Sequence, residues 1–173
     1  MLFKGILCLM ILLAGAVAGK LKAQALDNRV IHLRELITAL KVLESEMKYR
    51  LDPLPELLIR LGSARESLVN EFFETAGRLL NQRTGRDLSL CWEEAVETVY
   101  RESALCKEDR QILIDLGTGL GKTDLVNQEG LFRRTFSILE AQSAKAEEDK
   151  KTKGKMYQSL GTAVGILIVI LLI

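Results

Sequence analysis

Hydrophobic positions recur every three or four residues through most of this 173-residue chain. That spacing places them on one face of an α-helix. Charged residues stand between them, as on a solvated face, and no segment alternates with a period of two between hairpin turns. The pattern predicts an all-α protein, with an antiparallel bundle of about six helices over residues 25–150.

Prolines and glycines indicate where the predicted helices begin and end. A helix from Leu26 to Met47 stops before Pro53, because residues that precede proline avoid the α region, and a short helix follows as far as Gly62. Ser89 is expected to cap the helix that contains Trp92. The remaining helices are expected over residues 68–80, 112–120 and 125–155.

Two uncharged runs flank the predicted bundle. They are residues 5–19, GILCLMILLAGAVAG, and residues 160–173, LGTAVGILIVILLI. Extended over residues 1–20 and 156–173, the two runs form helices of roughly 30 Å and 27 Å, close to the ~30 Å hydrocarbon core of a bilayer. The sequence therefore predicts one transmembrane helix at each end, in contact with the lipid bilayer.

The first run has a second interpretation. Lys4 and the small residues Ala16-Val17-Ala18 also fit a cleaved secretory signal. However, six lysines lie beside the runs, at Lys20, Lys22 and within residues 150–155, and such residues favour the cytoplasmic side. A cleaved signal would leave them outside, so we favour two retained spans with the bundle in the cytoplasm, and cleavage stays open.

Each run also contains two glycines four residues apart. They are Gly15 with Gly19, and Gly161 with Gly165. Glycines at this spacing let two helices approach closely in lipid. We expect the two spans to pack there as a hairpin. The alternative is that glycine is simply common in membrane helices.

Composition and charge predict no chemical site. Lys and Arg number 24 against 23 Asp and Glu, so no basic surplus indicates nucleic acid. The three cysteines are scattered, and the one histidine, His32, has no ligand partner at a suitable spacing. Acidic runs such as Glu93-Glu94 suit a solvated helix face. We expect no catalytic, cofactor or metal site, and a protein that is not an enzyme.

One stretch resembles a nucleotide-binding loop. Residues 111–123 read QILIDLGTGLGKT, and Gly121-Lys122-Thr123 fit the end of the G-x-x-x-x-G-K-[ST] pattern. Leu116 stands where the first glycine belongs, and no later apolar strand ends in an aspartate that could bind magnesium. We interpret the stretch as a tight turn, with Thr123 or Asp124 capping the next helix.

The order of several short motifs resembles the stage III sporulation protein AB family. The closing motif precedes an apolar tail, and the resemblance spans nearly the whole chain. Leu51-Asp52 and Lys122-Thr123 depart from the family pattern. The motifs are Asp52-Pro53-Leu54, Leu88-Ser89 with Trp92, Leu116-Gly117-x-x-Leu120-Gly121-x-x-Asp124, and Met156-Tyr157-x-Ser159-Leu160-Gly161.

The resemblance implies a role in endospore formation, in the mother-cell membrane around the forespore. The family's soluble part is similar to the cytoplasmic domains of F-type platform proteins of type II secretion and type IV pilus machines. By this fold-level analogy, a non-enzymatic platform would dock a motor ATPase, stage III sporulation protein AA, at the base of a channel with other components. The alternatives are a self-associating structural membrane protein, as a homo-oligomer, and a membrane-anchored NTPase.

The expected docking residues lie at the two helix breaks. They are Pro53, Leu54, Leu116, Gly117, Leu120, Gly121 and Asp124. The other interpretation of both breaks is that they are tight turns that close the bundle.

Overall fold

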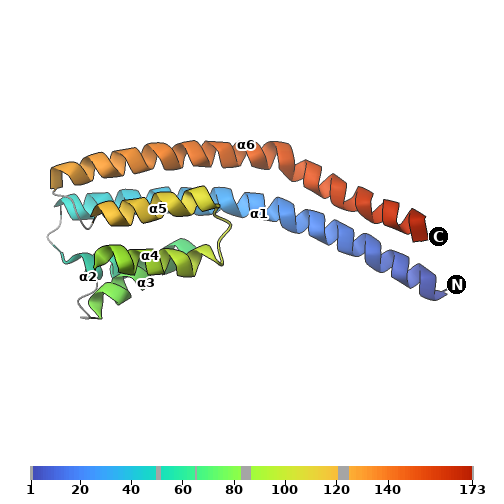
Figure 1. Ribbon diagram of the computed structural model, residues 1–173, viewed down its shortest axis with the longest axis horizontal. Helices are drawn as coiled ribbons and strands as arrows, with labels where there is room; N and C mark the ends of the chain where they lie inside the picture. Colours follow the sequence, from blue (N-terminus) through green and yellow to red (C-terminus); the bar gives the residue numbers. More distant parts are fainter. Residues whose placement is uncertain (1, 50–51, 65, 83–86, 121–124, 173) are drawn as a thin grey trace. The chain divides into compact units, whose positions relative to one another are not determined.

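A computed structural model describes residues 2–49, 52–64, 66–82, 87–120 and 125–172 (Figure 1), with backbone alone for residues 2–9, 12, 125–126 and 171–172. These ranges form helices and no strand, which confirms the all-α class. Two compact units are present, residues 31–144 and residues 1–30 together with 145–173. The helices are α1 (Leu2–Tyr49), α2 (Leu54–Gly62), α3 (Leu68–Asn81), α4 (Leu88–Tyr100), α5 (Lys107–Leu120) and α6 (Leu125–Leu172).

The apolar ends of the chain are parts of longer helices. Helices α1 and α6 each have 48 residues, so residues 2–20 and 156–172 are not separate elements. In α1 no proline follows the apolar run, and in α6 none precedes it. The Lys, Ala, Gln and Glu residues that join each run to the rest of its helix favour a continuous helix. Within the described residues, no helix is both long and apolar enough to cross a membrane. The two transmembrane spans therefore stay predictions.

The core of residues 31–144 is formed by one apolar face from each of the six helices. Helix α2 packs on α3, α3 on α4, and α4 on α5 (Figure 1). Burying a large apolar side chain stabilises the fold by roughly 1.5–3 kcal/mol. The largest buried side chains are Leu33, Leu36, Leu40, Leu43, Leu58, Phe73, Trp92, Val96, Leu116, Phe132 and Leu139.

Trp92 occupies the centre of this core. The ring of Phe72 meets the Trp92 ring edge-to-face, with centroids 4.9 Å apart, and Phe73 lies behind it at 6.3 Å. The indole Nε1–H of Trp92 donates a hydrogen bond to the carbonyl oxygen of Leu113 at 2.8 Å. A buried indole needs such a partner, because an unsatisfied N–H costs free energy. Trp92 therefore connects α3, α4 and α5.

Polar groups define where three helices begin. Ser67 Oγ accepts the backbone N–H of Asn70 at 3.2 Å at the start of α3. Before α5, the fully buried carboxylate of Asp109 accepts the N–H of Cys106 at 2.9 Å, as the acidic residue does in a capping box. Helix α4 begins at Leu88 with Asp87 as its N-cap residue. The expected cap Ser89 is therefore wrong, because the helix begins earlier and Ser89 lies in its first turn.

The second unit consists of the apolar end of α1 and the C-terminal part of α6, packed antiparallel. A Cβ atom built on Gly15 would lie 2.6 Å from the carbonyl oxygen of Gly161, and one on Gly19 would lie 2.6 Å from that of Tyr157. Further along the same pair of helices, Lys150 Nζ lies 3.1 Å from Asp27 Oδ1. As α1 advances from Gly15 to Asp27, its contacts on α6 move back from Gly161 to Lys150. The two helices thus keep one antiparallel register.

Candidate functional site

The first expected docking site lies at the start of α2. Pro53 precedes the helix and is exposed, and Leu54 is half-buried in the first turn. The neighbouring backbone is restrained by Arg60, whose guanidinium lies 3.0 Å from Asp52 Oδ2 and 2.7 Å from Glu46 Oε2. Part of this corner is therefore accessible to a partner.

The second expected docking site lies mostly in the core. The side chains of Leu116 and Leu120 are buried, and Gly117 packs against the Trp92 indole. These three residues hold α5 in the bundle. Gly121 and Asp124 lie outside the described residues. A docking role for the set stays a prediction.

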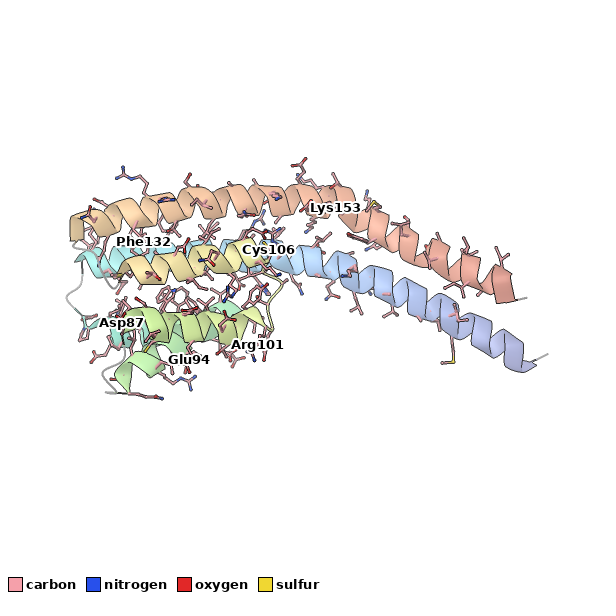
Figure 2. The ribbon with its side chains drawn as sticks, viewed as in Figure 1. Asp87, Glu94, Arg101, Cys106, Phe132 and Lys153 are labelled. Carbon is pink, nitrogen blue, oxygen red and sulfur yellow. The ribbon has the colours of Figure 1, made fainter. Side chains whose placement is uncertain are left out.

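Helix α4 presents an exposed surface that sequence analysis did not single out. Leu90, Glu93, Glu94 and Glu97 follow one another at helical spacing and line a shallow groove of about 550 Å³. We call these four residues the α4 stripe. The Leu90 side chain is 61% exposed, and the carboxylates around it give the groove a negative charge. Figure 2 labels Glu94 on α4 and Asp87 directly before that helix.

The α4 stripe is restrained by its own neighbours. Glu97 Oε1 accepts a hydrogen bond from Arg110 Nε at 2.6 Å, so one carboxylate is anchored to α5. On the opposite face of α4, Trp92 and Val96 are buried. The helix is thus held rigidly while its acidic face and Leu90 stay accessible. The sequence signal was available, because Leu90 falls outside the apolar face that holds Trp92, Ala95 and Val99.

The titratable residues near the loop between α4 and α5 hold that loop in place. His32 Nδ1 accepts the backbone N–H of Ala104 at 3.2 Å. Burial lowers the pKa of His32, against a weaker opposing effect of Glu35, so the imidazole stays neutral as the hydrogen bond requires. Burial also raises the pKa of the Cys106 thiol to about 11. Among the described residues, no group of His, Cys, Asp or Glu could hold a metal ion.

The four glycines singled out in the apolar ends come together. Gly15 and Gly19 on α1 lie against Gly161 on α6, and the Gly165 Cα lies 3.3 Å from the Cβ position of Gly15. Because glycine has no side chain, the backbones of α1 and α6 can approach each other this closely. That the contact forms inside a membrane is a separate prediction.

Comparison with known proteins gives three findings. The family model of stage III sporulation protein AB matches residues 4–173. The stage III sporulation protein AB of Bacillus subtilis (strain 168) is 28% identical over 151 residues, which cover 87% of each chain. A solved structure of a stage III sporulation protein AB superimposes with a TM-score of 0.68 at 25% identity, covering 72% of this chain and 98% of that one. The similarity extends over the bundle and both apolar ends.

Proposed function

The chain belongs to the stage III sporulation protein AB family, and on this premise we propose that it is a non-enzymatic membrane platform that docks a motor ATPase. The platform stands in the mother-cell membrane around the forespore, with its bundle in the cytoplasm. Its motor is stage III sporulation protein AA, and it serves a secretion-like channel between the two cells. Membership of the family supports the sporulation role, and the analogy with F-type platforms supports the motor contact.

The membrane anchor is supported by the sequence and by side-chain exposure. Residues 5–19 and 160–173 carry no charge, although part of each run lies outside the described side chains. Glycines face the helix contact, whereas large apolar side chains such as Leu13, Val17 and Leu167 are exposed. A soluble protein rarely exposes so continuous an apolar surface. The acyl chains of a lipid bilayer would cover such an apolar surface.

The α4 stripe is the observation that carries the docking proposal. An exposed leucine beside three glutamates on one helix face combines apolar and charged groups, as protein interfaces do. The stripe suits a partner surface with an apolar pocket and lysine or arginine around it. The corner at Pro53 and Leu54 is the second candidate contact.

The test uses the full chain in lipid nanodiscs and the purified motor ATPase. We expect saturable binding by the unaltered chain, and binding weakened about tenfold or more by Leu90→Glu, because a charge would face a desolvated pocket. Leu54→Glu tests the second contact in the same way. The matched control is Ile138→Glu, which adds the same charge at another exposed apolar position of the bundle, on α6. Retained binding by every variant would remove both contacts from the proposal.

Two other outcomes would change the function itself. Absence of motor binding, together with oligomers of the unaltered chain, would favour a self-associating structural membrane protein. ATP binding by the chain alone, lost in Lys122→Ala, would favour the membrane-anchored NTPase. Both readouts use the same preparation as the motor assay.

A further inference from the structure

The paired helices of the second unit bring six lysines into one stretch of about two helical turns. Gly19 contacts Tyr157 and Gly161, and Asp27 pairs with Lys150, so the antiparallel register places residues 20–22 of α1 beside about residues 155–157 of α6. These two segments and the residues next to them read KLK (20–22) and KKTKGK (150–155), without one acidic residue. The lysines therefore gather on both helices, next to where the apolar ends begin.

Four of these lysines have no ion-pair partner among the described residues. Lys150 pairs with Asp27, and Lys153 pairs with Asp149 at 2.6 Å. The remaining four are exposed. Lys20 and Lys22 point to nearly opposite sides of α1, whereas Lys151 and Lys155, four residues apart, lie on one face of α6. Figure 2 labels Lys153 on α6 beside them. We call the unpaired set the lysine collar, and it consists of Lys20, Lys22, Lys151 and Lys155.

We propose that the lysine collar binds the phosphate groups of anionic lipids. This inference rests on the proposed membrane anchor, because the collar adjoins the apolar ends. An unpaired ammonium is a strong point charge that recognises phosphate. Lysine stems also reach along an apolar surface and place the charge at the headgroups. Each lysine near an anionic bilayer surface strengthens binding roughly fivefold.

The collar is arranged for a lipid surface and not for one soluble anion. A single phosphate site needs several donors that converge on one point. Here the four lysines are divided between two helices, and those on α1 point to nearly opposite sides, so they meet different headgroups of the same leaflet. Tyr157, half-buried at the same level, has the amphipathic character of a residue at the membrane interface. Phosphatidylglycerol, with a net negative charge, is the probe, and phosphatidylcholine with the same acyl chains is the neutral reference.

The test measures lipid retention by the full chain in neutral detergent, using native mass spectrometry. We expect the chain to retain phosphatidylglycerol about tenfold or more over phosphatidylcholine. K20Q/K22Q/K151Q/K155Q should reduce this preference to less than about twofold. K20R/K22R/K151R/K155R keeps the charge and should keep the preference. The matched control R101Q/K107Q/R133Q/R134Q removes four charges from the bundle and should behave as the unaltered chain.

Separate outcomes distinguish the collar from the anchor. If the chain resists alkaline extraction from vesicles but shows no lipid preference, the collar proposal is wrong and the anchor stands. If it fails to enter vesicles of either composition, the anchor is wrong and the collar with it. Inorganic phosphate at matched ionic strength should not displace the lipid. Displacement would show a site for free phosphate and overturn the lipid assignment.

Discussion

The indole ring of Trp92 fills the space in which a Cβ atom at residue 117 would stand. A Cβ built on Gly117 would lie only 2.8 Å from Trp92 Nε1 and still closer to two ring carbons. The same Nε1–H donates to the carbonyl oxygen of Leu113, one turn before Gly117 on α5. Trp92 is therefore held by its hydrogen bond and by its packing at once, and it cannot move away from a larger residue without losing that bond.

Gly117→Ala should destabilise the bundle by about 1–3 kcal/mol. Alanine favours a helix interior over glycine by roughly 1 kcal/mol, but the overlap with Trp92 exceeds that gain. Gly130→Ala is the matched control, since a Cβ on Gly130 of α6 meets nothing within 4 Å. This control should stabilise the chain by about 0.5–1 kcal/mol. Denaturant unfolding of both variants measures the two opposite changes, and equal effects would refute the packing argument.

The helical pattern of the sequence predicted much of this arrangement. Proline at residue 53 and glycine at residue 62 bound α2 as expected, and many of the expected core positions of the bundle, such as Leu33, Phe73 and Trp92, are buried. Local patterns could not show that Gly117 fits the Trp92 ring, because that contact joins residues 25 positions apart in the chain. They also could not separate Asp87 from Ser89 as the cap of α4, since both residue types favour that position.

The candidate docking surfaces also show how little local sequence patterns reveal about tertiary packing. The sequence places Leu116 and Leu120 near a helix break, where we expected docking residues. Both side chains are buried, and their burial depends on neighbours from other helices that local spacing does not reveal. Leu90 has the residue type of a core position, and only its spacing places it outside the face that holds Trp92, Ala95 and Val99. The packing of Trp92 on the opposite face of α4 shows that Leu90 faces outward. An exposed apolar residue is recognised from the three-dimensional packing of its helix.

The hydrogen bond between His32 and Ala104 should make stability depend on pH. Burial lowers the folded-state pKa of His32 below its ordinary value near 6.5, so the unfolded chain binds the proton more readily. The contribution of His32 to the free energy of unfolding is fully present above pH 6.5. It is lost as the pH falls from 6.5 through the lowered pKa of the folded state. His32→Asn keeps an acceptor for the Ala104 N–H and removes the titration. Unfolding midpoints at pH 7.5 and pH 5 should therefore differ less in the variant.

His32 is the chain's one histidine, so the comparison isolates a single imidazole. Carboxylates that titrate near pH 5 contribute equally to both proteins and cancel in the difference. An identical pH dependence in the variant would mean that His32 titrates alike in the folded and unfolded chains.

The thiol of Cys106 should react slowly with alkylating reagents. With a pKa of about 11, the thiolate fraction at pH 8 is roughly a hundredfold below that of an ordinary cysteine. Cys91 is buried and should react more slowly still. Iodoacetamide labelling of a Cys8→Ser background, read by peptide mapping, measures both thiols. Labelling should accelerate as the pH approaches 11, and both thiols should react rapidly in denaturant. Rapid labelling of Cys106 at pH 8 in the folded chain would contradict its burial.

The contact between the apolar ends should depend on Gly161 far more than on Gly154. A Cβ on Gly161 would lie 2.9 Å from the Gly19 Cα and closer to the Gly15 carbonyl, whereas one on Gly154 meets nothing within 4 Å. Gly161→Leu should therefore push the two helices apart, because backbone atoms cannot give way as a side chain can. Gly154→Ala should leave the pair unchanged.

Crosslinking in lipid nanodiscs can measure this separation. Cysteines introduced at Asp27 and Lys150, which pair across the helices at 3.1 Å, should be joined in high yield by a short bis-maleimide in a Cys8→Ser background. Gly161→Leu should lower that yield severalfold, while Gly154→Ala should keep it. The two substitutions lie on the same helix and differ in whether the missing side chain faces a neighbouring backbone. Equal yields in all three proteins would show that the glycine contact does not hold the two helices together.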